Sequence, residues 1–126
     1  MLKEAARRTR KNEIPPSLVR ADAHYLPFAD ASFAGAVCGG SLNEFGDPAG
    51  ALRETRRVLV SGGRVAIMGL LKASSARGRF LQSFLSTGGV RFFEPEEMTS
   101  LLDQAGFDPE SVEISGLAFF AGATRR

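Results

Sequence analysis

The sequence has 126 residues, of which 44% are hydrophobic and 24% charged, with a formal net charge of +2 at pH 7. This composition is typical of one globular domain and excludes a disordered chain or two domains. The small net charge is weak evidence for a polyanionic partner. The single cysteine, Cys38, excludes an internal disulfide and a cysteine metal cluster, and it favours a reducing compartment. No apolar run could span a bilayer and no secretory signal is readable, so we expect a cytoplasmic protein without a metal site or a membrane partner.

The first predicted element is a helix over residues 1–12. Its apolar side holds Leu2, Ala5, Ala6 and Thr9, and its other side holds Lys3, Arg7, Arg8, Arg10 and Lys11. Such a basic side either contacts nucleic acid or is simply solvated. Because no aromatic residues are interleaved, the solvated side is favoured and a nucleic-acid partner is not expected. Residues 14–16 then break the helix, and residues 18–21 are expected to form a short strand that ends at Asp22.

The middle of the chain reads as strand, helix and strand. Residues 35–39 form an apolar run with small side chains, which predicts a buried strand. Asp47 is a good N-cap for a helix that continues to Leu59, and Gly62 and Gly63 are expected to close that helix in a tight turn. Residues 65–68 are then predicted as a strand covered on both faces. This order is half of a parallel β-α-β unit.

The last third begins with a polar stretch, residues 72–79, followed by apolar residues at helical spacing. These are Phe80, Leu81, Phe84 and Leu85, and Gly88 ends the helix. They either line a site for a small hydrophobic or aromatic molecule or pack into the core. Residues 95–105 predict a second helix, closed by Gly106, whose buried stripe is Met98, Leu101, Leu102 and Ala105. Residues 112–114 and 117–123 predict two antiparallel strands.

Three of these segments resemble S-adenosylmethionine-dependent methyltransferases of the Rossmann-like class I, type 11. Residues 22–28 match the family pattern D-A-x-x-L-P-F, and residues 52–59 match L-x-E-x-x-R-V-L before a Gly-Gly pair. Residues 91–107 resemble the closing helix, which ends in Ala-Gly-Phe. The chain departs from the family at Val60-Ser61, where Lys-Pro is usual, and at Ala34, where an aspartate is usual. The resemblance implies an α/β fold with a truncated, mostly parallel sheet and a C-terminal antiparallel hairpin.

The same resemblance implies S-adenosylmethionine as cofactor and a small-molecule methyl acceptor. Asp22 would accept a hydrogen bond from the adenine amino group, and the backbone N–H of Ala23 would face the ring, with Gly39 and Gly40 beside it. The alternative for Asp22 is an N-cap of the turn that follows. Asn43 and Glu44 would orient or deprotonate the acceptor, or they belong only to the loop and cap before Asp47.

His24, the only histidine, has no partner acid that the sequence identifies, so a surface position is expected.

The family's first strand, with its glycine-rich loop, has no counterpart here, and neither has the acidic end of its second strand. The whole chain, with a variable acceptor-covering segment over residues 72–90, is then one partial methyltransferase domain. It is either a fragment of a longer enzyme or a non-catalytic module. In the second case it would form homodimers through an exposed sheet edge.

Overall fold

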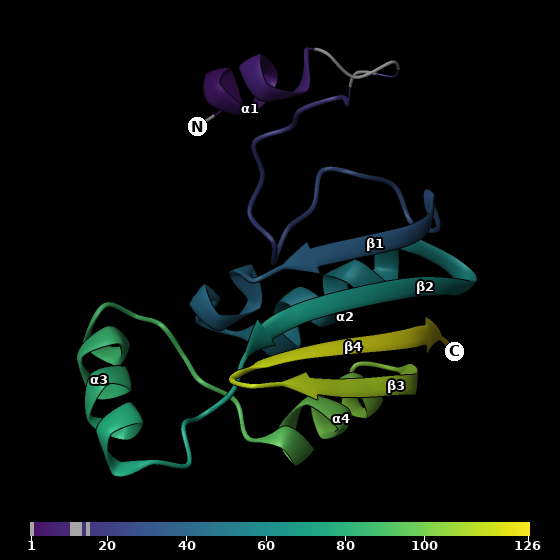
Figure 1. Cartoon of the computed structure of the whole chain (residues 1–126). Coiled ribbons are helices and arrows are strands. Elements are labelled where there is room, and N and C mark those ends of the chain that lie inside the picture. The colour runs from purple at the N-terminus through teal and green to yellow at the C-terminus, as the bar shows by residue number, and fades with distance from the viewer. Residues whose placement is uncertain (1, 11–13, 15) are drawn as a thin grey trace.

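The computed structural model describes residues 2–10, 14 and 16–126 (Figure 1). Its helices and strands, in chain order, are α1 (Leu2–Thr9), β1 (Phe33–Gly39), a 3₁₀ turn η1 (Ser41–Glu44), α2 (Pro48–Val58), β2 (Leu59–Leu70), α3 (Ala76–Thr87), α4 (Pro95–Gln104), β3 (Phe107–Ser115) and β4 (Ala118–Arg125). Part of the predicted first helix, at residues 1, 11 and 12, lies outside the described residues. The other predicted helices and the C-terminal hairpin are confirmed within a few residues.

The four strands form one mixed sheet in the order β1-β2-β4-β3. β1 and β2 are parallel, whereas β4 is antiparallel to both of its neighbours. The expected α/β fold with a C-terminal antiparallel hairpin is therefore present. A helix between β1 and β2 gives the chain the crossover that a parallel pair requires.

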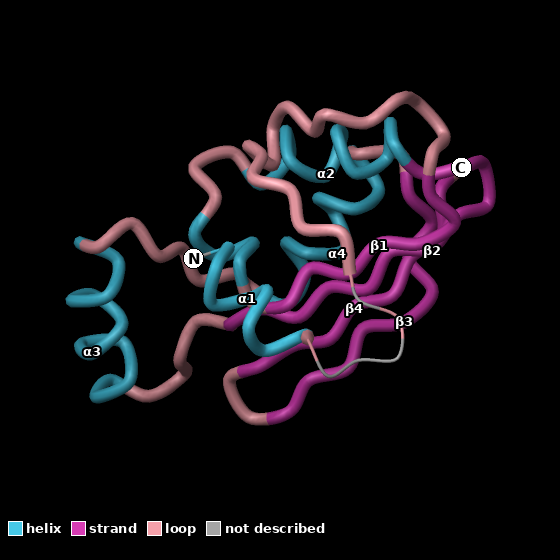
Figure 2. Tube along the Cα trace, turned by 90° about the horizontal axis from the view of Figure 1, so that it is seen from above, coloured by secondary structure: helices cyan, strands magenta, loops and turns pink. Residues whose placement is uncertain are grey.

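One face of the sheet carries the core. Along β2, Val65 and Ile67 are buried while Met68 and Leu70 stay partly exposed, and β4 alternates in the same way around Phe119 and Ala121. Helices α2 and α4 lie together on the buried side (Figure 2). The prediction that residues 65–68 are covered on both faces is wrong, because α2 and α4 pack on a single face.

β1 is an edge strand. Val37 is 84% exposed, and among the described residues β1 pairs only with β2. The prediction of a fully buried strand over residues 35–39 is therefore wrong. Residues 18–21 do not form the predicted strand either, since no neighbouring strand offers them a hydrogen-bonding partner and their side chains are exposed.

The helix α2 begins as predicted but ends differently. The Asp47 carboxylate accepts a hydrogen bond from the backbone N–H of Gly50 at 2.9 Å, with Pro48 at the first helical position. The helix runs directly into β2 at Leu59, and the left-handed residue comes three positions later at Gly62, where φ is 74°. A Cβ on Gly63 would lie 2.8 Å from the Val60 carbonyl oxygen, so the glycines form a tight irregularity inside β2 instead of closing the helix.

Two helices follow β2, and they differ in how they pack. In α4, Met98 and Leu102 are fully buried, as the sequence predicts. In α3 no residue is buried, and Phe80 and Phe84 are more than 60% exposed. The alternative in which the aromatic residues of α3 fill the core is therefore wrong.

Candidate cofactor site

The carboxyl end of β1 and the loop at residues 22–26 border one apolar cavity. The cavity has a volume of about 260 Å³ and extends between β1 and α2. Ala23 and Gly39, two of the predicted cofactor-binding residues, both line it, together with Leu26, Leu42 and Phe45. A cavity of this size, below the roughly 300–1,000 Å³ of sites for drug-sized ligands, suits a planar ring such as a purine but not a whole nucleoside sulfonium.

Asp22 precedes Ala23 and folds back on His24. One carboxylate oxygen, Oδ1, accepts a hydrogen bond from the backbone N–H of His24 at 2.9 Å and lies 2.8 Å from Nδ1 of the ring. Within the described chain, Oδ2 takes part in no hydrogen bond and stays available to a ligand. The contact with the His24 backbone, and then that with the ring, hold the pKa of Asp22 below its ordinary value. The turn-capping alternative is thus present, and it leaves one oxygen for the predicted adenine contact.

The His24 ring joins this loop to the start of α2. Its Nε2 lies 2.9 Å from the backbone carbonyl oxygen of Asp47, while Nδ1 faces Asp22. Both ring nitrogens face oxygen acceptors, which only the imidazolium form satisfies with two donors. Asp22 first, and the Asp47 carbonyl second, raise the pKa of His24. Asp22 is therefore the partner acid that the sequence did not identify.

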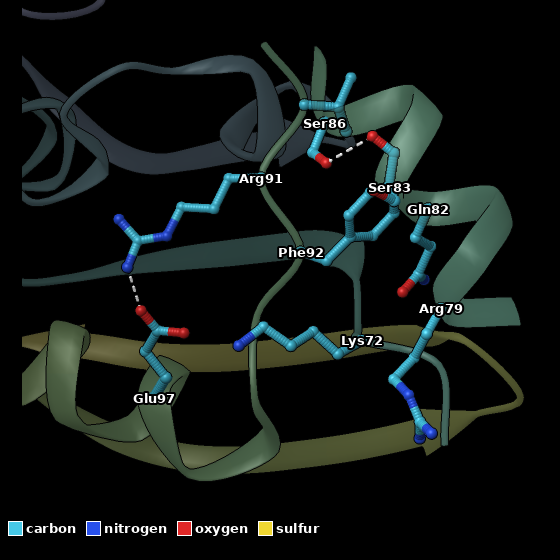
Figure 3. A pocket seen from close by; sticks show the side chains of 9 residues that line it. Lys72, Arg79, Gln82, Ser83, Ser86, Arg91, Phe92 and Glu97 are labelled. Carbon is cyan, nitrogen blue, oxygen red and sulfur yellow. Dashed lines mark hydrogen bonds and ion pairs between the residues drawn. The ribbon is translucent and has the colours of Figure 1, made fainter. Parts of the chain in front are cut away.

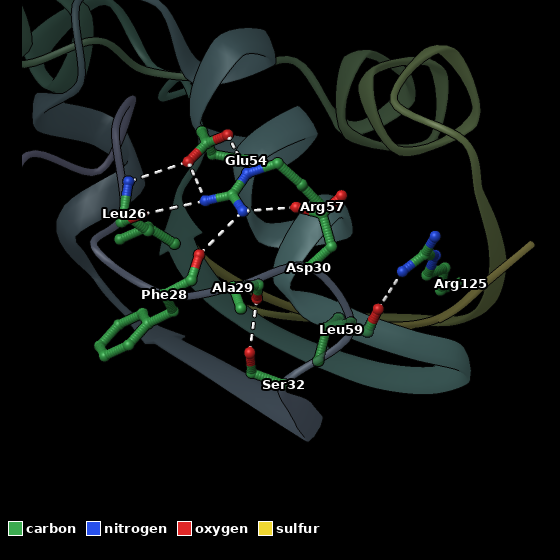
Figure 4. A network of polar contacts seen from close by, with 9 residues as sticks. All are labelled: Leu26, Phe28, Ala29, Asp30, Ser32, Glu54, Arg57, Leu59 and Arg125. Carbon is green, nitrogen blue, oxygen red and sulfur yellow. Dashed lines mark hydrogen bonds and ion pairs between the residues drawn. The ribbon is translucent and has the colours of Figure 1, made fainter.

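A second set of contacts fixes the same loop from α2 (Figure 4). The Arg57 guanidinium donates to the carbonyl oxygens of Leu26 and Phe28 at 2.9 and 2.8 Å, and to the carboxylate of Asp30 at 2.7 Å. Glu54 accepts from Arg57 at 2.7 Å and from the backbone N–H of Leu26 at 2.8 Å. These contacts, that with Arg57 first, lower the pKa of Glu54.

Sequence reasoning missed the part that Glu54 and Arg57 play at this site. Their spacing of three residues, which allows an ion pair on one helical face, and their position in the motif L-x-E-x-x-R-V-L were the available signals. We call Glu54 and Arg57 the loop clamp.

The loop after β1 contains the other predicted site residues. Gly40 has a φ of 84° and begins η1, a conformation that a side chain would strain. Asn43 is 1% exposed, and within the described part of the chain its side chain bonds only to backbone groups, namely the N–H and carbonyl of Leu70 and the carbonyl of Arg91. Glu44 is exposed at the end of η1. Asn43 thus supports the loop, and its action on an acceptor, like that of Glu44, stays a prediction.

The described residues contain neither a cluster of metal ligands nor a membrane-spanning helix. The described part holds no group of three or more His, Cys, Asp or Glu side chains placed to bind a metal ion. None of its helices is both long and apolar enough to cross a bilayer.

Cys38 is half-buried against the core, with its Sγ 3.4 Å from the Ser41 hydroxyl.

The chain matches a known protein family. The sequence pattern of the methyltransferase domain family matches residues 1–67. The chain is similar to the demethylmenaquinone methyltransferase of Thermotoga maritima, with 30% identity over 131 residues, covering 86% of this chain and 56% of that protein. It is also similar to the 2-methyl-6-phytyl-1,4-hydroquinone methyltransferase 1 of rice, Oryza sativa subsp. japonica, with 27% identity over 109 residues, covering 86% of this chain and 32% of that one.

Solved structures share the fold. A SAM-dependent methyltransferase from Methanosarcina mazei superposes with a TM-score of 0.76 at 20% identity, covering 98% of this chain and 74% of that one. The chain therefore belongs to the methyltransferase domain family, and it shares the Rossmann-like fold of solved SAM-dependent methyltransferases. It spans about half the length of the first curated relative and about a third of the second.

Proposed function

We propose that the chain takes part in S-adenosylmethionine-dependent methyl transfer to a small-molecule acceptor. The observation that carries this proposal is the convergence of Ala23 and Gly39 on one apolar cavity, beside an Asp22 whose Oδ2 is free within the described chain. The residues fit the adenine part of the cofactor: the apolar cavity would take the ring, Oδ2 of Asp22 would accept a hydrogen bond from its amino group, and the Ala23 N–H would face its edge. Gly40, next to Gly39, has no side chain that would obstruct the ring.

The cofactor supplies an activated methyl group bound to a sulfonium sulfur. The residues of this chain hold the adenine end and keep the 22–32 loop in place through the loop clamp, so the gain in rate comes from proximity and orientation. The cofactor would supply its methyl group to an oxygen or carbon of the acceptor, while Asp22 and Ala23 would hold its adenine end. The acceptor's proton passes to a base, for which the exposed Glu44 carboxylate is the candidate within the described loop, with Asn43 positioning that loop.

The relatives indicate what kind of acceptor to test. Their names specify a menaquinone precursor and a phytyl-substituted hydroquinone. A ring of this class, placed over residues 72–90, is the acceptor that we propose. We further propose that residues 1–126 are one partial methyltransferase domain of a cytoplasmic protein, which acts as part of a longer enzyme.

The test is calorimetric titration of the purified chain with S-adenosylhomocysteine. We expect micromolar binding and a loss of at least about tenfold in Asp22→Ala, since about 1.4 kcal/mol corresponds to a factor of ten. Asp108→Ala, which removes an exposed carboxylate on β3, is the matched control and should bind like the wild type. A folded chain that binds nothing would refute cofactor binding by this chain alone. If binding is found, transfer of labelled methyl to soluble hydroquinones tests the acceptor.

A second candidate function rests on the edge of β1 that pairs with no other strand among the described residues. Val37 on this strand is 84% exposed, and the open sheet face beside it exposes Met68 and Phe120. Such an edge and face are typical of a module that self-associates without catalysis. Sedimentation equilibrium distinguishes the two: a concentration-dependent dimer that Val37→Lys converts to a monomer supports association, and a monomer at all concentrations refutes it.

A further inference from the structure

Helix α3 is amphipathic, and its polar side faces the rest of the protein. Its polar stripe lines a pocket of about 520 Å³ against the segment at residues 90–92 (Figure 3). This stripe consists of Arg79, Gln82, Ser83 and Ser86. Its apolar stripe lies on the opposite side of the helix and consists of Phe80, Leu81, Phe84 and Leu85, which are 69, 64, 62 and 49% exposed. A surface helix normally buries its apolar stripe, so this orientation is inverted.

Specific contacts fix the orientation. The Gln82 side-chain amide donates to the Leu71 carbonyl oxygen at 2.9 Å, and its oxygen accepts from the backbone N–H of Ala73 at 2.7 Å. At the start of the helix, Arg79 donates to the Ser74 carbonyl oxygen at 2.6 Å. On the outward side, Phe80 and Phe84 stack edge to face with their ring centroids 5.2 Å apart. The outward apolar stripe is therefore held in place by the polar contacts of the other side.

The charge around α3 has one sign. Residues 71–93 contain Lys72, Arg77, Arg79 and Arg91 and no acidic residue. Lys72 pairs with Glu94 at 3.0 Å and Arg91 pairs with Glu97, both acids lying beyond this segment. Within the described chain, Arg77 and Arg79 form no ion pair. Arg77 lies one turn before Leu81, at the N-terminal end of the apolar stripe.

We propose that α3 is a peripheral membrane-binding helix whose apolar stripe enters the surface of an anionic lipid bilayer. Phenylalanine and leucine side chains provide the insertion, and Arg77, at the end of the same stripe, faces the lipid phosphates, while Arg79 on the other side adds to the positive charge of the region. The sequence-based expectation of no membrane partner rested on the absence of a spanning segment. A 12-residue helix that lies in the interface needs no such segment.

The size of the patch separates this occupant from a second copy of the chain. The four side chains expose on the order of 400–500 Å², taking roughly 150–250 Å² for a whole phenylalanine. A stable protein interface needs about 800 Å² from each partner. The patch is thus too small to hold a dimer by itself, and its excess of positive charge would make two copies repel each other.

The test is flotation of the full chain with phosphatidylglycerol-containing vesicles and with pure phosphatidylcholine vesicles. We expect at least tenfold tighter binding to the anionic vesicles, weakened by 0.5 M salt, which is of the order at which such attraction is screened. Because the chain has no tryptophan, Phe84→Trp supplies a single tryptophan whose emission should shift to the blue on binding. Vesicle binding needs neither cofactor nor acceptor, so it succeeds or fails independently of the methyl-transfer proposal.

Matched variants decide which side chains bind. The double variant Phe80→Ser/Phe84→Ser should lose at least tenfold in affinity, and Arg77→Gln, which leaves the Arg79 contact with Ser74 in place, should reduce the preference for anionic vesicles. Ile114→Ser, which removes a 53% exposed apolar side chain from β3, should bind like the wild type. Each variant is first checked for folding by circular dichroism. The proposal would be overturned if the folded wild type did not bind vesicles, or if the phenylalanine variant bound them equally well. It would also be overturned if the wild type formed a dimer that the phenylalanine variant could not form.

Discussion

Asn43 offers the sharpest test of how the site loop is supported. Replacing Asn43 with alanine removes the side-chain partner of two backbone groups of Leu70 and one of Arg91, in a place where Asn43 is 1% exposed. A buried polar group left without a partner costs about 1–3 kcal/mol. If one of the three groups finds another partner, two remain without one, and we expect Asn43→Ala to lower the free energy of unfolding by about 2–6 kcal/mol. That is a large share of the roughly 5–15 kcal/mol of a typical domain.

Urea denaturation followed by circular dichroism measures this loss. Asn43→Leu keeps the branched shape of the side chain and removes every hydrogen bond, so it should be destabilised nearly as much as the alanine variant. Gln104→Ala is the control, because it deletes an exposed amide that bonds only the Ser100 hydroxyl, and it should change the stability by at most about 0.5 kcal/mol. A loss below about 1 kcal/mol in Asn43→Ala would refute the supporting role. A stable variant that binds cofactor but transfers no methyl would instead favour the catalytic one.

The remaining predictions concern the same side of the molecule. Arg57→Met should weaken S-adenosylhomocysteine binding at least tenfold, because it releases the 22–32 loop. Arg57→Lys keeps the charge but loses the forked guanidinium, so its affinity should lie in between. Unchanged titrations for both variants would contradict the loop clamp. The single histidine resonance in NMR should titrate above 6.5, and Asp22→Asn should return it toward that value. Because the pKa of His24 is raised, the stability from its contact with Asp22 is complete below 6.5 and is lost as the pH rises through the folded value. Because the pKa of Asp22 is lowered, the stability that its carboxylate contributes is complete above pH 3.8 and is lost as the pH falls through the folded value. A stability that does not change with pH would contradict the pair. Gly69→Ala should destabilise by about 1–3 kcal/mol in thermal unfolding, because its Cβ would lie 2.5 Å from the Phe119 ring.

Features that depend on neighbouring residues in sequence could be predicted from the sequence alone. The Asp47 cap forms as expected, and the Glu97 carboxylate accepts from the Glu94 backbone N–H at 3.3 Å to begin α4. The buried stripe of α4 follows from helical spacing, and Met98 lies at its centre. Each of these depends on residues within two turns of one another.

Features that depend on distant partners could not be predicted. The apolar pair Leu18 and Val19 suited a strand, but a strand needs a neighbour, and the local pattern carries no information about one. The spacing of the apolar residues in α3 identified a helix without showing which side faces the protein. The bonds of Gln82 to the backbone near Leu71 decide that side. For the candidate site, the motif indicated Asp22 and Ala23, whereas the reach of Arg57 to Phe28 is visible only in three dimensions.

The position of β4 between β2 and β3 has a consequence for how the chain folds during synthesis. β4 is the last of the four strands to leave the ribosome, yet it contributes Phe119, Ala121 and Ala123 to the core and pairs along both of its edges. Until residues 118–125 emerge, β2 has only β1 beside it and β3 has no partner. The nascent protein therefore exposes the apolar surface of β2, α2 and α4 until translation of these strands is nearly finished. A premature stop before Ala118 would leave a chain that chaperones and proteases treat as unfolded, although three of its four strands had been made.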